Sequence, residues 1–133
     1  MTRVAAVLTC LALAGCGAAP ARQARTVDLG VEATLAPGST VSVKGTELNV
    51  RFVAVSDDSR CPKDVTCIWA GEVKVQLEIQ LAQNVSRVEF LEGGVKASGP
   101  YRVMLVRVEP QPTSKARIAP QDYRATLKIE RVG

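Results

Sequence analysis

Hydrophobic and polar residues alternate with period two along much of the chain, and Gly, Pro, Asn and Asp interrupt the alternation. The clearest example is Glu72 to Leu81, where Val, Leu and Ile alternate with Lys, Gln and Glu. Residues 47–54 and 123–130 repeat the pattern. Such alternation is typical of strands that are buried on one face and solvated on the other. These three segments are therefore predicted to be strands.

Further strands are predicted from weaker signals. Tyr101 to Glu109 is apolar on both faces, as expected for a central strand. Shorter strands are predicted at residues 26–29, 32–35, 40–43 and 85–91. Turns are predicted at Pro37-Gly38, Lys44-Gly45, Gly93-Gly94 and Gly99-Pro100. Pro110, Pro112 and Pro120 predict an extended connection before the last strand, because proline cannot donate to a strand ladder.

The strand pattern predicts an all-β fold. Seven to eight short strands within residues 26–133, with no helical period, favour a single antiparallel β-sandwich with a Greek-key crossing. A small β-barrel is the alternative. A domain of this size buries a modest core, so one covalent crosslink would add a large share of its stability.

The N-terminal segment has the features of an export signal. Arg3 precedes an apolar stretch from Val4 to Ala14, which is shorter than the roughly 20 residues that a membrane-spanning helix needs. We expect residues 1–15 to be a signal peptide, residues 16–25 a lipidated N-terminus and flexible tether, and residues 26–133 the folded domain. An ordinary secretory signal, cleaved near Ala18-Ala19 or after Ala21, is the alternative.

Leu13, Ala14, Gly15 and Cys16 resemble the lipobox of bacterial lipoproteins. The resemblance implies diacylglycerol on Cys16, cleavage before it and acylation of the new amino terminus. Acyl chains contribute about 0.8 kcal/mol per buried methylene, so several chains hold a protein firmly on a membrane. Gly17, rather than Asp, favours the outer membrane facing the periplasm if the source has two membranes. We therefore expect a lipid-anchored protein of the cell envelope.

The absence of histidine limits the chemistry of the chain. It excludes Ser-His-Asp and Cys-His nucleophilic sites, His-based zinc and copper sites, and haem held by His. The acidic pairs Asp57/Asp58 and Glu89/Glu92 are interpreted as surface charge, since neither has a spacing that defines a catalytic pair. Few aromatic residues and an exported chain disfavour nucleic acid as a partner. We expect neither a cofactor nor a metal.

Charge is distributed unevenly along the domain. Residues 26–95 contain ten acidic and six basic side chains, whereas residues 96–133 contain three acidic and eight basic ones. The division indicates either an acidic partner for the second part or opposite charges that meet across strands. The second interpretation is favoured.

The segment from Asp57 to Glu72 joins two predicted strands and contains the last two cysteines. In an oxidising envelope compartment, Cys61 and Cys67 are expected to form a disulfide, worth roughly 2 kcal/mol in the chain-entropy model. Five intervening residues are too many for a Cys-x-x-Cys redox centre. Two thiolates without histidine are too few ligands for zinc.

This segment resembles a motif of small uncharacterised exported and lipid-anchored bacterial proteins, Asp-Ser-Arg-Cys-Pro-x4-Cys-x-Trp-x-Gly. The matching residues are Asp58, Ser59, Arg60, Cys61, Pro62, Cys67, Trp69 and Gly71. The resemblance supports the predicted fold and implies no particular activity.

The segment has a scaffold interpretation and a recognition interpretation. As scaffold, Trp69 covers the disulfide and plugs one end of the sandwich, and Gly71 allows a close turn into the next strand. Arg60 then pairs with an acidic residue, for which Asp57, Asp58 and Glu72 are the candidates. As a recognition loop, it presents five side chains to a partner. These candidate binding residues are Arg60, Lys63, Asp64, Trp69 and Glu72. The scaffold interpretation is favoured.

These features predict a noncatalytic binding or assembly module of the cell envelope, with a membrane contact through lipid on Cys16 and a protein or glycan partner. The alternative is an inhibitor in which loop 57–72 occupies the active site of an exported hydrolase. A His-free hydrolase that uses carboxylates is the third hypothesis.

Overall fold

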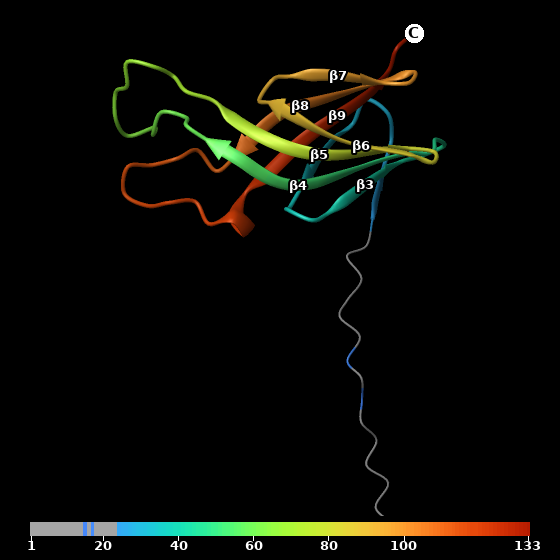
Figure 1. The fold of residues 1–133 in the computed structure, drawn as a ribbon, viewed down its shortest axis with the longest axis horizontal. Helices are drawn as coiled ribbons and strands as arrows, with labels where there is room; N and C mark the ends of the chain where they lie inside the picture. Colours follow the sequence, from blue (N-terminus) through green and yellow to red (C-terminus); the bar gives the residue numbers. More distant parts are fainter. Residues whose placement is uncertain (1–14, 16, 18–23) are drawn as a thin grey trace, which may run out of the picture.

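A computed structural model describes residues 15, 17 and 24–133. The predicted lipidation site Cys16 lies outside these residues, as do nearly all of the predicted signal peptide and most of the tether. The described part of the chain forms two packed sheets (Figure 1). Their strands are β1 (Arg25–Val27), β2 (Glu32–Leu35), β3 (Thr40–Val43), β4 (Leu48–Asp58), β5 (Val73–Leu81), β6 (Asn84–Leu91), β7 (Val95–Ser98), β8 (Tyr101–Glu109) and β9 (Arg124–Arg131), with a single 3-10 turn, η1 (Pro120–Asp122).

The two sheets confirm the predicted β-sandwich. One sheet has the strand order β1-β3-β4-β5-β6 and the other has the order β2-β9-β8-β7. Every pair is antiparallel except β1 with β3. The chain leaves the second sheet after β2, returns at β7, and runs back through β8 and β9 to lie beside β2. This is a Greek-key order in which the long connection comes first and passes through the other sheet.

The alternating pattern of the sequence builds the core. In β5, Val73, Val75, Leu77 and Ile79 are buried, and the residues between them are partly exposed or exposed. β4 and β9 contribute in the same way, and β8 lies inside its sheet as predicted. Burying each such side chain stabilises the fold by about 1.5 to 3 kcal/mol relative to leaving it exposed.

Two strand predictions differ from the structure. β4 continues to Asp58, whereas the predicted strand ended at residue 54. The prediction ended too early because register shifts after Phe52 and after Val55 break the period of two in the sequence. β7 was not predicted. None of its four residues is buried, so this edge strand has no apolar alternation to reveal it.

Opposite charges meet across strands, but among the described residues only the ion pair of Arg107 with Glu32 joins the acidic part of the chain to the basic part. Arg102 on β8 pairs with Glu130 on β9 at 3.1 Å, and Arg107 pairs with Glu32 from the acidic part of the chain, also at 3.1 Å. These pairs are partly exposed, so each contributes at most about 1 kcal/mol. Burial of apolar side chains therefore stabilises the sandwich more than its surface ion pairs do.

The burial of the core predicts how strongly truncation of a core side chain destabilises the domain. Phe52 on β4 is fully buried, so Phe52→Ala should lower the free energy of unfolding by about 3 to 5 kcal/mol through lost burial and the cavity left behind. Val31→Ala, at a half-exposed position, should change it by less than about 0.5 kcal/mol. Urea unfolding of both variants measures the difference. Equal effects would show that the core is packed differently.

Candidate functional site

Two loops lie together at one end of the sandwich, the left end in Figure 1. We call residues 59–72, between β4 and β5, the braced loop, and residues 110–123, between β8 and β9, the proline connection. The Lys63 N–H donates to the Pro112 carbonyl at 3.0 Å. The Asp64 carboxylate accepts hydrogen bonds from the Ser114 N–H at 2.8 Å and from the Ser114 hydroxyl at 2.5 Å. The two loops therefore form a single surface.

The braced loop is closed in three places. The predicted disulfide is present between Cys61 and Cys67, whose Cα atoms lie 5.9 Å apart. Closer to the strands, the Ser59 N–H donates to the Glu72 carbonyl and the Cys61 N–H to the Ala70 carbonyl, each at 2.8 Å. Together these bonds bring the two arms of the loop back to each other and fix its base.

Arg60 and Asp58 form a nearly buried ion pair at the base of the loop. The Arg60 Nε and Nη2 groups donate to the two Asp58 carboxylate oxygens, each at 2.8 Å, and the two side chains are 8% and 11% exposed. Arg60 Nη1 also donates to the Val108 carbonyl at 2.8 Å, and Nη2 to the Pro110 carbonyl at 3.1 Å. Of the three acidic partners considered for Arg60, the structure shows Asp58.

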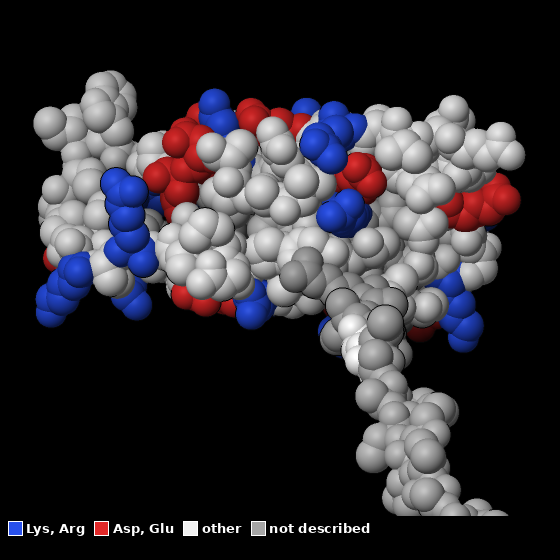
Figure 2. Space-filling view, turned by 60° about the horizontal axis from the view of Figure 1, so that its bottom comes forward, with Lys and Arg blue, Asp and Glu red and all other residues white. Residues whose placement is uncertain are grey.

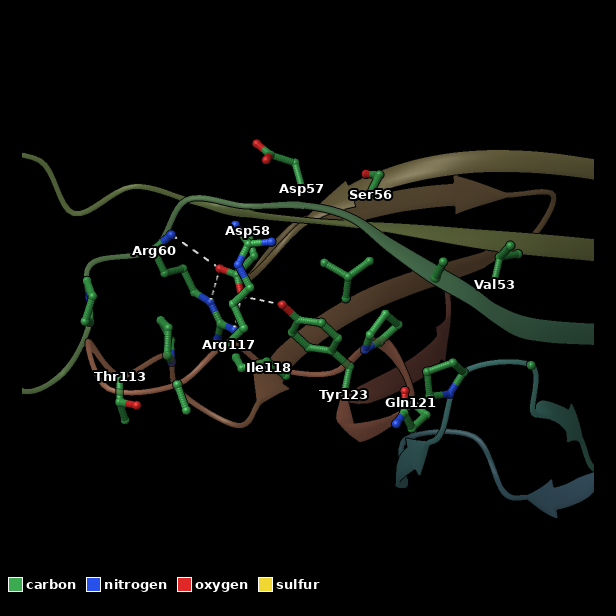
Figure 3. Close-up of a pocket in the computed structure, with 18 of the residues that line it drawn as sticks. Val53, Ser56, Asp57, Asp58, Arg60, Thr113, Arg117, Ile118, Gln121 and Tyr123 are labelled. Carbon is green, nitrogen blue, oxygen red and sulfur yellow. Dashed lines mark hydrogen bonds and ion pairs between the residues drawn. The ribbon is translucent and has the colours of Figure 1, made fainter.

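Two further side chains complete this network. The Tyr123 hydroxyl donates to Asp58 Oδ2 at 2.9 Å, reaching from the segment just before β9 towards the end of β4 (Figure 3). Glu92 accepts a hydrogen bond from the Val108 N–H at 2.7 Å. The interpretation of Asp58 as surface charge is therefore wrong, because its side chain is only 11% exposed and bonds to Arg60 and Tyr123, whereas Glu92 is exposed as predicted. The sequence carries no local signal for either contact.

The network sets the ionisation of its members. Burial raises the pKa of Asp58, but hydrogen bonds from Arg60 and Tyr123 and the Arg60 charge outweigh it, so the pKa lies below its usual 3.8. The hydrogen bond with Asp58 raises the pKa of Arg60. Burial and the hydrogen bond to Asp58 raise the pKa of Tyr123 to about 12. At neutral pH, Asp58 is ionised and Tyr123 is neutral, which suits a structural role rather than proton transfer.

The prediction that Trp69 plugs the sandwich is wrong. Its side chain is 82% exposed, and the neighbouring Ile68 is 92% exposed. Both lie beyond the Cys61–Ala70 hydrogen bond, on the far side of the loop base from the core. The Arg60–Asp58 pair and Tyr123 already occupy this end of the sandwich. Val65 on the same loop is 46% exposed, and we call Val65, Ile68 and Trp69 the tip.

Gly71 makes the close turn that was predicted. Its φ angle is +68°, and a Cβ atom at this position would overlap the Ser59 carbonyl oxygen. Any other residue would strain the backbone and push the two arms of the loop apart.

Among the other candidate binding residues, some side chains hold the two loops together and others are exposed on the surface. Arg60 and Asp64 use their side chains to hold the two loops together, through bonds to Pro110 and Ser114. Glu72 pairs with Lys74 at 3.6 Å in a partly exposed ion pair. Lys63 has an exposed side chain that takes part in none of the ion pairs among the described residues. Of the five candidates, Trp69 and Lys63 are therefore the best placed to contact a partner.

A groove of about 950 Å³ lies between β4 and the proline connection (Figure 3). The sequence did not predict this groove, because it forms where the late part of β4 meets a connection about 60 residues later in the chain. Its lining includes Arg51, Arg117 and apolar residues from both segments.

The described part of the chain comprises residues 15, 17 and 24–133. In this part of the chain, no group of three or more Cys, Asp or Glu residues lies close enough to hold a metal ion. The same residues include no helix that is long and apolar enough to cross a membrane. No protein-family model, curated protein or solved structure gives a significant match to the chain.

Removal of Arg60 should destabilise the domain more than removal of an exposed arginine. Arg60→Ala leaves the Asp58 carboxylate nearly buried without its cation, and we expect a loss of about 3 kcal/mol in unfolding free energy. Arg107→Ala removes an ion pair whose side chains are 46% and 47% exposed, and should cost less than about 1 kcal/mol. Denaturant unfolding compares the two variants. Similar losses would show that the Arg60–Asp58 ion pair stabilises the domain no more than an exposed ion pair does.

The lowered pKa of Asp58 predicts that the stability of the folded domain depends on pH. A carboxylate with a depressed folded pKa adds stability that is complete above its unfolded pKa, here near 3.8, and is lost as pH falls through the folded value. The stability difference between wild type and Asp58→Asn should therefore be largest near neutral pH and shrink below about pH 4. Thermal unfolding from pH 7 to pH 2 measures it, with Asp28→Asn as the exposed control. A constant difference across this range would contradict the assigned role.

Proposed function

We propose that the protein is a noncatalytic binding module of the bacterial cell envelope that contacts a partner protein through the tip. The observation that carries the proposal is the exposure of Ile68 and Trp69 on a closed, hydrogen-bonded loop. Exposed apolar groups on such a loop gain little within the domain itself. Buried aromatic and aliphatic anchors, by contrast, supply much of the free energy at protein interfaces.

The bracing of the loop supports this function. Binding costs free energy when side chains and loops become ordered, and a loop that is already fixed avoids much of that cost. The disulfide, the contacts to the proline connection and the Arg60 network all hold the tip before any partner arrives. The scaffold and recognition interpretations of the sequence are therefore combined in one loop.

The loop end also carries basic side chains. Lys63, Lys115 and Arg117 are exposed and form no ion pair among the described residues. Figure 2 shows Lys and Arg side chains at this end of the molecule, beside an uncharged protrusion. An acidic rim on the partner would complement these charges and accelerate association.

The cellular setting of the proposal comes from the sequence. The lipobox-like residues Leu13 to Cys16 support lipid attachment at Cys16, and Gly17 supports an outer-membrane location facing the periplasm where two membranes exist. Lipid attachment would keep the binding domain close to other envelope proteins.

Inhibition of an exported hydrolase is a second candidate, favoured by one observation. The disulfide-closed loop carries exposed apolar side chains at its tip, a shape suited to a concave active site. A panel of exported proteases and lysozyme-like enzymes, assayed with micromolar protein, tests this candidate. Inhibition that disappears in Trp69→Ala supports it, and unchanged activity of every enzyme rejects it.

Site-specific crosslinking tests the binding proposal. A photoreactive phenylalanine analogue at position 69 should give a discrete adduct with one envelope protein in intact cells. The same analogue at position 85, which is 58% exposed on β6, is the matched control and should give none. Ile68→Ala, with the analogue kept at position 69, should reduce the adduct several-fold without lowering the melting temperature. Absence of an adduct at position 69, or the same adduct at both positions, would overturn the proposal.

A further inference from the structure

Beside the groove, β4 has an edge that no other described strand pairs with. β3 pairs with β4 only as far as Thr40, which lies opposite Arg51. The last backbone bonds on this side join Phe52 to the β2–β3 turn, from the Phe52 N–H to the Ser39 carbonyl and from the Gly38 N–H to the Phe52 carbonyl. Beyond Phe52, β4 continues to Asp58 with β5 as its only strand partner among the described strands.

The groove lies along this part of β4. Val53 and Val55 line it from the strand, and Ile118 lines it from the proline connection. The Tyr123 side chain also lines it and is held by its hydrogen bond to Asp58. The lining therefore combines apolar side chains with a strand edge.

Two arginines that form no ion pair within the described part of the chain add charge to the groove. Arg51 and Arg117 both line it, and neither forms an ion pair with a described residue. Three other strand arginines, Arg87, Arg102 and Arg107, have carboxylate partners. Two carboxylates, those of Asp57 and Asp58, also line the groove. Arg60 neutralises the nearly buried Asp58, so Asp57 supplies the negative charge that remains in the lining. The remaining charge favours an acidic ligand.

We propose that this groove binds an extended acidic peptide segment, which lies along the free edge of β4. Its apolar side chains would pack on Val53, Val55 and Ile118, and its carboxylates would pair with Arg51 and Arg117. Addition of a strand to an exposed sheet edge is a common mode of peptide recognition, in which the backbone supplies affinity and side-chain pockets supply specificity.

The geometry of β4 favours a short segment. Val53 to Asp57 spans about 13 Å at the usual rise of a strand. The register shifts after Phe52 and after Val55 interrupt the regular ladder, and bulges of this kind prevent a long strand from pairing along an edge. A peptide of a few residues therefore fits this edge better than continuous sheet pairing with a second copy of the chain.

The groove proposal goes beyond the proposed function and stands separately from it. The tip residues Val65, Ile68 and Trp69 are not part of the groove lining. A Trp69→Ala variant should therefore bind peptide as wild type does. Failure of the tip crosslink and failure of peptide binding are thus distinguishable results.

Selection from a displayed library of random nine-residue peptides tests the proposal on the folded domain with its disulfide intact. We expect recovered peptides in which Asp or Glu alternates with apolar residues. For a synthetic peptide of the recovered sequence, Arg51→Glu/Arg117→Glu should weaken binding at least tenfold. Lys44→Glu, at an exposed lysine that does not line the groove, is the matched control and should change it less than twofold.

A second measurement tests the binding mode. Bound peptide should slow hydrogen exchange at one or more backbone amides of residues 53–58, and N-methylation at alternate peptide positions should weaken binding in one register only. Basic or uncharged recovered sequences, equal binding by the double arginine variant, or no added protection along β4 would overturn the proposal. So would a library that yields no enriched peptide.

Discussion

The loop end depends on one side chain, Arg60, and on the groups that its guanidinium joins. It bonds to the Asp58 carboxylate at the end of β4 and to the Val108 and Pro110 carbonyls at the end of β8. These strands belong to different sheets, so the contacts fasten the two layers of the sandwich together at this end. A nearly buried cation is tolerated here because its carboxylate and carbonyl partners replace lost hydration.

Several features of the loop end follow from this fastening. Tyr123 and Glu92 extend the network to β9 and to the turn before β7, while the contact between Asp64 and Ser114 joins the outer parts of the two loops. With this end of the sandwich occupied, Trp69 and Ile68 remain outside on a closed loop. The same arrangement places the proline connection opposite the late part of β4 and forms the groove between them. The proposed contacts with partners therefore use surfaces that a structural network creates.

The sequence predicts what depends on local pattern and misses what depends on distant pairing. Alternating residues located β5 and β9 closely, and a segment apolar on both faces located β8. Two cysteines in a chain expected to be exported were enough to predict the disulfide. Interrupted alternation concealed the late part of β4. The environment of Trp69 was predicted wrongly, because an aromatic residue near a disulfide has no local signal that distinguishes packing from exposure. The carbonyl partners of Arg60, on Val108 and Pro110, lie about 50 residues away, and no spacing rule reveals them.

Amide hydrogen exchange offers the most direct test of whether Arg60 fixes the two loops against each other. In wild type, the Lys63 and Ser114 amides, which bond to Pro112 and Asp64, should exchange more slowly than free surface amides. In Arg60→Ala both should exchange rapidly, while the amides of Leu77 and Leu127 in the two sheets stay protected. Rapid exchange at Lys63 and Ser114 in wild type, or undiminished protection there in Arg60→Ala, would contradict the central role of Arg60.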